Sequence, residues 1–353
     1  MPGPGGISEQ SWRQPKMEWT VGKALAARLG STLGSRTKRV RTEPRRPASG
    51  LSRRSAAAGC PGPDSRVFPA SGLGDAVSVA LEPVALARCA LRRLLPEQTI
   101  GMIQQTIGMI DYIRSPDRGA GWGPFNGQTA RQALFVDIIS KTRPHAIVET
   151  GTFLGATTGL MLLTGLPVFT IELHPRNYGF ARARFWRRRN VKLLRGDSRT
   201  GLLRLFDGAL HPLSGSTVFF YLDAHWNDDL PLAEEIDVVF SRCPSAVVMI
   251  DDFEVPSDPG YGFDDYGPGK ALVSSYIRPA ISAHQLRAFY PSTPSVADYP
   301  STPMAAAGLA VPDKLRRGCV VLAKEACHGP VLASIPLLRP ASNAELISTH
   351  SIR

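Results

Sequence analysis

Three carboxylates and a histidine in the second half of this chain have types and spacing that could activate a hydroxyl group. Asp223 and His225 follow the apolar run VFFYL, and Asp251 and Asp252 close the apolar run AVVMI. Both runs are typical of buried strands, and the carboxyl ends of parallel strands meet at one edge of a sheet. Three carboxylates without a cysteine beside the aspartate pair suit a hard cation, so Asp223, Asp251 and Asp252 are the predicted ligands of Mg²⁺. The alternative is that Asp251-Asp252 is a turn-forming pair.

His225 would lie at the mouth of the same crevice, two residues after Asp223. The ordinary pKa of imidazole suits a general base that removes a proton at neutral pH, so His225 is the predicted catalytic residue. A metal beside it would lower the pKa of a bound hydroxyl and align that oxygen with the reacting carbon. Two alternatives for His225 stay open, a structural histidine and an additional metal ligand.

A second set of residues follows three earlier apolar runs and is typical of a nucleotide-binding crevice. The first run leads through glycines into a helix, whose N-terminus offers free N–H groups. Glu172 closes the second run 21 residues beyond Gly151, about the distance at which an acid meets ribose hydroxyls. Asp197 follows the third run, where a carboxylate can accept a hydrogen bond from an adenine amino group. The predicted cofactor-binding residues are Glu149, Gly151, Thr152, Phe153, Gly155, Glu172, Asp197 and Ser198.

The first turn favours a cofactor without phosphate over a dinucleotide. A dinucleotide fold uses G-x-G-x-x-G so that a pyrophosphate can sit on the helix end, but Thr152 and Phe153 fill this turn. A carboxylate at Glu149 would repel a pyrophosphate and would suit the ammonium group of a methionine moiety. Taken singly, Glu149 could instead be a capping acid, Glu172 a surface residue and Asp197 a helix N-cap.

The elements that must position these residues alternate between strands and helices of about 10 to 15 residues. Such alternation predicts a Rossmann-like, doubly wound α/β fold with a mostly parallel sheet. Two later runs, separated only by a loop, predict an antiparallel edge pair, which makes a seven-stranded sheet. The predicted strands are 146–150, 168–173, 191–198, 218–226, 246–253, 285–290 and 318–323.

These features together resemble the class I S-adenosylmethionine-dependent methyltransferases over about residues 120–325. The resemblance includes E-x-G-x-x-x-G after the first strand, with Phe153 in place of the usual middle glycine, and GDS after the third. Asp223 with the 251–252 pair is similar to the metal-dependent O-methyltransferases, nearest the macrocin (sugar) O-methyltransferases and cephalosporin-hydroxylase-like proteins. The resemblance implies S-adenosylmethionine as cofactor and three carboxylates that hold Mg²⁺. It also implies a hydroxylated small-molecule acceptor such as a sugar or another natural product.

The rest of the chain predicts a basic tail and a helical extension. Residues 1–70 carry 13 Lys and Arg against 4 Asp and Glu, which is most of the net charge of +11, so the folded part does not suggest nucleic-acid binding. We predict a disordered tail at 1–74, a helical extension at 75–119 and a methyltransferase domain at 120–353. A stripe of Ile100, Ile103, Ile107 and Ile110 predicts packing on the domain or on a second subunit, as in a homodimer.

Composition also restricts the location of the protein. The sequence has no run of ~18 apolar residues, so it predicts no membrane span, and its start lacks the apolar core of a secretory signal. Five scattered cysteines favour a reducing compartment, so we expect a cytoplasmic protein.

Two loops could each have more than one role. Asn126 and Gln128 could reach the cofactor or belong to a capping turn, and 255–270 could be a lid over the acceptor.

Two other functions fit the same topology. One is a nicotinamide-dependent oxidoreductase, which the first turn disfavours. The other is a binding protein that kept the fold without turnover, which the set of Asp223, His225, Asp251 and Asp252 disfavours.

Overall fold

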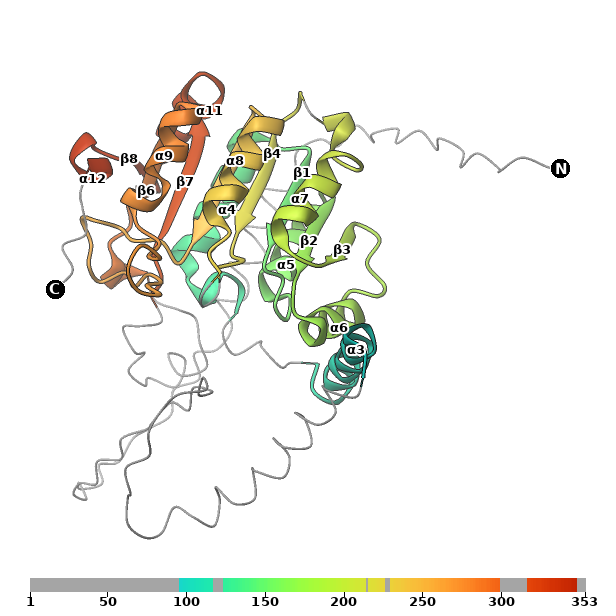
Figure 1. Ribbon diagram of the computed structural model, residues 1–353. Helices are drawn as coiled ribbons and strands as arrows, with labels where there is room; N and C mark the ends of the chain where they lie inside the picture. Colours follow the sequence, from blue (N-terminus) through green and yellow to red (C-terminus); the bar gives the residue numbers. More distant parts are fainter. Residues whose placement is uncertain (1–94, 117–122, 214, 226–228, 299–315, 348–353) are drawn as a thin grey trace, which may run out of the picture. The chain divides into compact units, whose positions relative to one another are not determined.

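The computed structural model describes residues 95–116, 123–213, 215–225, 229–298 and 316–347 (Figure 1). The predicted tail at 1–74 and the parts of the helical extension at 75–94 and 117–119 lie outside the described residues, so these predictions stay predictions. In the described part, no helix is both long enough and apolar enough to cross a membrane. The described residues from Gly101 onward belong to one compact unit, which contains Gly101–Arg353.

One eight-stranded sheet forms the centre of this unit, in the order β3-β2-β1-β4-β5-β7-β6-β8. Strands β1 to β5 are parallel, and β7 pairs antiparallel with both β5 and β6. The predicted doubly wound sheet with an antiparallel edge pair is confirmed, but it has eight strands rather than seven. The strands are β1 (Ala146–Thr150), β2 (Val168–Glu172), β3 (Val191–Arg195), β4 (Val218–Leu222), β5 (Ala246–Asp251), β6 (Leu286–Pro291), β7 (Cys319–Lys324) and β8 (Leu338–Pro340).

The central strands are buried on both faces. Every residue of β1, β4 and β5 is buried, which explains why these segments are continuous apolar runs without polar alternation. The additional strand β8 is short, ends in a proline, and pairs only with β6 at the edge of the sheet. Three residues give too little periodicity for a strand to be recognised from sequence.

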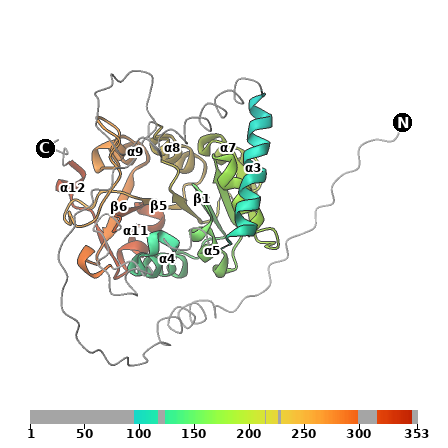
Figure 2. The same cartoon turned by 90° about the horizontal axis from the view of Figure 1, so that it is seen from below.

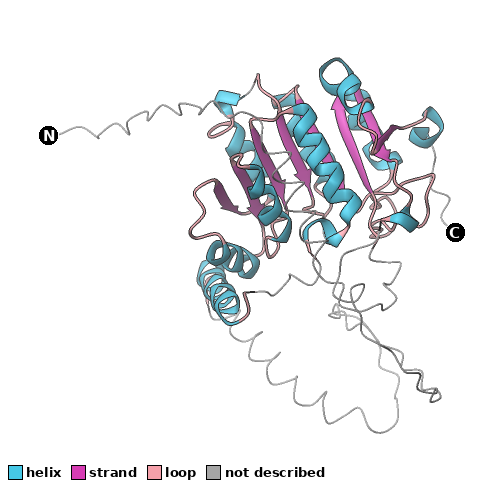
Figure 3. Ribbon diagram, turned by 180° about the vertical axis from the view of Figure 1, so that it is seen from behind, coloured by secondary structure: helices cyan, strands magenta, loops and turns pink. Residues whose placement is uncertain are grey.

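Helices cover both faces of the sheet, as Figure 2 shows from below. One apolar core lies between the sheet and α4, α5, α6 and α11, and a second lies between the opposite face and α7, α8 and α9. Figure 3 shows the strands enclosed by these helices. The helices are α3 (Glu97–Arg114), α4 (Thr129–Thr142), α5 (Ala156–Met161), α6 (Pro175–Arg184), α7 (Ser198–Phe206), α8 (Leu232–Arg242), α9 (Ser274–His284), α11 (Glu325–Ala333) and α12 (Asn343–Ile347), with 3₁₀ turns at Pro124–Gly127, Leu162–Thr164, His211–Leu213 and Ser295–Ala297.

Helix α3 packs on α6 through glycines and not through its isoleucines. The QTIGMI repeat places Gly101 and Gly108 on one helical face, and both are buried. A Cβ at Gly108 would lie 1.8 Å from the carbonyl oxygen of Arg176, and a Cβ at Gly179 of α6 would lie 2.0 Å from that of Gln105. The predicted packing of this helix on the domain is confirmed, but the contact uses the glycine face, and Ile103, Ile107 and Ile110 are exposed. The alternative, a second subunit, stays a prediction.

Candidate functional site

The ends of five parallel strands place the predicted site residues along one edge of the sheet. Strand β1 pairs with β2 on one side and with β4 on the other, and β4 pairs with β5. The turn after β1 is therefore next to the segments that follow β2 and β4. Open α/β sheets bind their ligands beyond this edge, and the region next to these strand ends is called the crevice.

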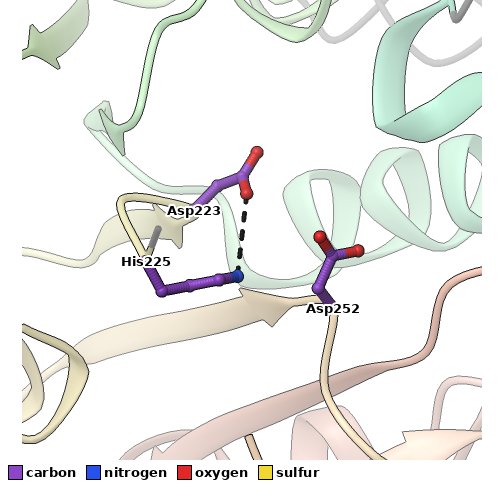
Figure 4. A group of neighbouring side chains, drawn as sticks. All are labelled: Asp223, His225 and Asp252. Atoms are coloured by element: carbon purple, nitrogen blue, oxygen red, sulfur yellow. Dashed lines mark ion pairs between the residues drawn. The ribbon is translucent and has the colours of Figure 1, made fainter. Parts of the chain in front are cut away.

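Asp223, His225 and Asp252 form one group, drawn in Figure 4. One ligand atom from each lies within 4.8 Å of the others, and His225 Nε2 is 3.9 Å from Asp223 Oδ1. Asp223 and His225 come from the segment after β4, and Asp252 comes from the end of β5. The group contains two of the three predicted metal ligands and the predicted base.

His225 differs from its two neighbours in burial. It is 3% exposed, and neither ring nitrogen has a hydrogen-bond partner among the described residues. The side chain of Asp223 is 32% exposed, so it faces the crevice. Burial lowers the pKa of His225. Partial loss of hydration, together with the neighbouring Asp252 carboxylate, raises the pKa of Asp223.

Asp251 points away from this group, although it is adjacent to Asp252 in sequence. Its carboxylate forms a buried ion pair with Arg131 of α4 and accepts a 2.5 Å hydrogen bond from the Tyr221 hydroxyl. Asn126 Nδ2 donates to the same carboxylate at 3.3 Å. The structure therefore places Asp251 in a structural network behind the crevice, while Asp252, with a φ of 51°, extends into it.

Asp252 also contacts the loop between β5 and α9. Arg317 Nε donates to Asp252 Oδ1 at 2.7 Å, and the same guanidinium pairs with Asp264 in that loop. The Tyr266 hydroxyl lies 3.3 Å from the carbonyl oxygen of His225 and donates to Asp264. The predicted lid segment 255–270 is thus attached to the site through a charged network.

Sequence reasoning did not identify several residues of this network, Arg131, Tyr221, Asp264, Tyr266 and Arg317. A signal was available for Arg131, a charged residue within the helix sequence TARQALFVDII whose other buried positions are mainly apolar. Arg317 and Asp264 lie in irregular segments, where the spacing of residues does not indicate which way a side chain points.

Glu149 lies below the crevice and not within it. It is fully buried and accepts hydrogen bonds from Thr158 at 2.5 Å and from Thr170 at 2.6 Å. Burial raises the pKa of its carboxyl to about 7. The Thr152 hydroxyl lies 2.5 Å from the Thr170 hydroxyl. The hydrogen bonds among Glu149, Thr152 and Thr170 therefore connect the first turn to β2.

The two glycines of the first turn are required by contacts within the protein. Gly151 has a φ of 82°, and a Cβ there would lie 2.1 Å from the carbonyl oxygen of Asp223. Gly155 has a φ of 76°, and a Cβ there would lie 2.5 Å from the ring of Phe185. Both positions need a left-handed conformation that glycine adopts without strain.

Glu172 is at the end of β2, next to the first turn. Its Oε2 accepts the N–H of Phe153 and its Oε1 accepts the N–H of His174, both at 2.7 Å. Burial raises the pKa of this carboxyl. Phe153 and Leu173, which flank it, are 56% and 65% exposed, so the carboxylate lies between two apolar surfaces that face solvent.

Asp197 is the N-cap of α7, the alternative considered for it above. Its side chain accepts the N–H groups of Arg199 and Thr200, and it pairs with the Arg199 guanidinium at 2.7 Å. These hydrogen bonds to Arg199 lower the pKa of Asp197. Ser198 is buried beside Glu235 of α8, whose carboxyl is fully buried with no hydrogen bond of ordinary geometry among the described residues. The adenine contact predicted for Asp197 stays a prediction.

No protein family model matches the chain, and no curated protein sequence matches it either. Solved structures similar to it include an O-methyltransferase from Bacillus cereus in complex with S-adenosylhomocysteine, with 15% identity, a TM-score of 0.37, and coverage of 61% of this chain and 89% of that one. An O-methyltransferase from Streptomyces achromogenes involved in tomaymycin synthesis has 15% identity, a TM-score of 0.35, and coverage of 55% and 78%. A precorrin-6y C5,15-methyltransferase from Geobacter metallireducens has 14% identity, a TM-score of 0.33, and coverage of 55% and 86%.

Proposed function

We propose that this protein is an S-adenosylmethionine-dependent methyltransferase that acts on a hydroxyl oxygen of a small molecule, such as a sugar. The observation that carries the proposal is the group of Asp223, His225 and Asp252 at the ends of β4 and β5. This group lies beside the turn after β1, where Gly151 contacts the Asp223 backbone. Groups that can accept a proton and a turn that can hold a methyl donor are therefore adjacent.

The residues around Glu172 fit the nucleoside part of the cofactor. Its carboxylate has lone pairs beyond those used by the two backbone N–H groups, so it can accept hydrogen bonds from ribose hydroxyls. The exposed side chains of Phe153 and Leu173 offer apolar surface to an adenine ring. Thr152 and Phe153 fill the first turn, where a dinucleotide fold uses glycine to admit a pyrophosphate, which disfavours a dinucleotide.

The chain's own residues would act on the acceptor by orienting it and by accepting its proton. Bound S-adenosylmethionine would supply the methyl group, which passes to the acceptor oxygen by in-line displacement. Such a displacement depends on alignment, so the fixed positions of the turn after β1 and of Asp223 supply part of the rate. The proton of the acceptor hydroxyl would pass to a carboxylate oxygen of Asp223, whose side chain is 32% exposed.

The same group would hold a divalent cation. The residues fit one, because two carboxylates face a common point with a buried imidazole whose nitrogens have no hydrogen-bond partner in the described part of the chain. A bound cation would lower the pKa of the acceptor hydroxyl. Asp223 and Asp252 would hold it, and the ion pair between Arg317 and Asp252 fixes one carboxylate in place.

Calorimetry and a methyl-transfer assay test the proposal. We expect the full chain to bind S-adenosylmethionine and not NAD, and to methylate members of a panel of hydroxylated natural products. The assay is run with EDTA and with added divalent metals, because loss and restoration of turnover separate an enzyme from a binding protein. Binding of NAD without binding of S-adenosylmethionine would overturn the assignment in favour of an oxidoreductase.

A further inference from the structure

We propose that Asp223, His225 and Asp252 form a site for a divalent transition metal, of the class of Mn²⁺, with one imidazole and two carboxylate ligands. This inference deepens the proposed function, on which it rests only for the position of the acceptor beside the metal. It replaces the Mg²⁺ site predicted at Asp223, Asp251 and Asp252, and it makes His225 a ligand rather than a free base.

The unpaired imidazole of His225 points to a ligand. The residue is 3% exposed, and both of its ring nitrogens lack a hydrogen-bond partner in the part of the chain that the structure describes. Buried polar groups in folded proteins almost always have a partner, because leaving one unpaired is unfavourable. The ring lies toward Asp223 and Asp252, so a cation bound by these carboxylates would satisfy a ring nitrogen (Figure 4).

The spacing of the three ligand atoms fits a single ion. Metal–ligand distances of about 2.0–2.2 Å place two ligand atoms of one ion about 3 to 4.4 Å apart. Here Nε2 of His225 is 3.9 Å from Asp223 Oδ1, and all three atoms lie within 4.8 Å of one another.

The backbone directs Asp252 and Asp251 to different tasks. Asp252 has a φ of 51°, which is uncommon for a residue other than glycine and concentrates at functional sites. Asp251 is held by Arg131 and Tyr221 and is not available to the ion. The buried Arg131–Asp251 pair thereby fixes the end of β5 from which Asp252 extends.

The charge of the site favours a transition metal over Mg²⁺. Arg317 already neutralises part of the charge of Asp252 and Asp264, so the site offers less negative charge than two free carboxylates would. Mg²⁺ depends on charged oxygens and gains little from imidazole, whereas the affinity of a site with a nitrogen ligand rises along the first-row transition metals, from Mn²⁺ to Cu²⁺. The neutral ligand His225 therefore contributes a larger share of the affinity for a cation at this site than it would beside carboxylates without an ion-pair partner.

Binding of Mn²⁺ to the full chain, measured by loss of the electron paramagnetic resonance signal of the free ion, tests the site directly. We expect Mn²⁺ to bind at least about tenfold more tightly than Mg²⁺, measured by competition. In His225→Ala the affinity for Mn²⁺ should fall by about tenfold or more, while the affinity for Mg²⁺ should change by less than about threefold. The matched control is His284→Ala, which removes the other described histidine–aspartate pair, with Asp237, and should leave both affinities unchanged.

A second measurement needs no variant that could fail to fold. With isotope-labelled histidine, Mn²⁺ should broaden the ring resonances of His225 before those of His284. Mn²⁺ binding no tighter than that of Mg²⁺, an unchanged Mn²⁺ affinity in folded His225→Ala, or equal broadening of both histidines would each overturn the inference. Two measurements separate failure of the metal site from failure of the proposed function. Methyl transfer without a transition metal would refute the metal site alone, whereas calorimetry that shows no binding of S-adenosylmethionine would refute the proposed function.

Discussion

Replacing Arg131 by methionine should destabilise this protein much more than a change on its surface. The side chains of Arg131 and Asp251 are 1% and 2% exposed, and the Tyr221 hydroxyl donates to the same carboxylate. Without the guanidinium, a carboxylate would remain buried with no cation beside it. Loss of one partner from a buried ion pair costs about 3–5 kcal/mol, so we expect the free energy of unfolding to fall by that amount. Methionine fills similar space, which keeps the packing loss small.

Urea unfolding followed by circular dichroism measures this change, and two further variants make the result specific. Arg287→Met is the matched control, because the Arg287–Glu325 pair is 37% and 55% exposed and such pairs contribute about 0–1 kcal/mol. Adding Asp251→Asn to Arg131→Met should restore part of the loss, because it removes the uncompensated charge. A cost for Arg131→Met no larger than that of Arg287→Met would refute the assignment of a buried ion pair behind the crevice.

Three other predictions concern the helices and the site. Burial raises the pKa of Glu235 from 4.5 to about 7, so its contribution to the free energy of unfolding is present below pH 4.5 and is lost as the pH rises to 7. Glu235→Gln should therefore stabilise the protein at pH 8 by about 3 kcal/mol and change little at pH 4, and equal effects in urea titrations at the two pH values would contradict this. Gly108→Ala should speed hydrogen exchange along α3, although alanine favours helices over glycine, because its Cβ would meet the Arg176 carbonyl; unchanged exchange would show that α3 does not pack there. Asp252→Ala should reduce methyl transfer by at least about 100-fold while S-adenosylmethionine affinity, by calorimetry, changes by less than about threefold, and full activity would remove Asp252 from the site.

The strands and their mostly parallel arrangement were accessible from sequence because the central sheet is buried on both faces. The runs 146–150, 218–222 and 246–251 contain almost only residues that must leave water, and the parallel arrangement follows from the helices between them. Strand β8 escaped prediction because its three residues lie at an edge, where pairing with β6 and not burial defines it.

The position of the site could be predicted, but the direction of its side chains could not. Strand ends locate Asp223, Asp251 and Asp252 at one edge of the sheet. Which aspartate enters the crevice depends on the left-handed conformation of Asp252 and on the partner that Arg131 offers to Asp251. Neither property is visible in the letters Asp-Asp, and the second depends on a helix more than a hundred residues earlier.

Helix α3 gives a related example. The QTIGMI repeat carries isoleucines and glycines at the same period, and hydrophobicity alone draws attention to the isoleucines. The contact with α6 uses the glycines, because only they allow two helix backbones to approach so closely.

The contact between Gly151 and the carbonyl of Asp223 has a consequence for how this protein could diversify. A main-chain contact helps to set the separation of the turn after β1 and the segment after β4, so in the proposed reaction exchange of side chains in the outer loops would alter which molecule is chosen while the reach of the transferred group stays the same. Any residue larger than glycine at position 151 would push the two halves of the reaction apart. New acceptors should therefore arise from changes in the segment 255–270, with this one position kept as it is.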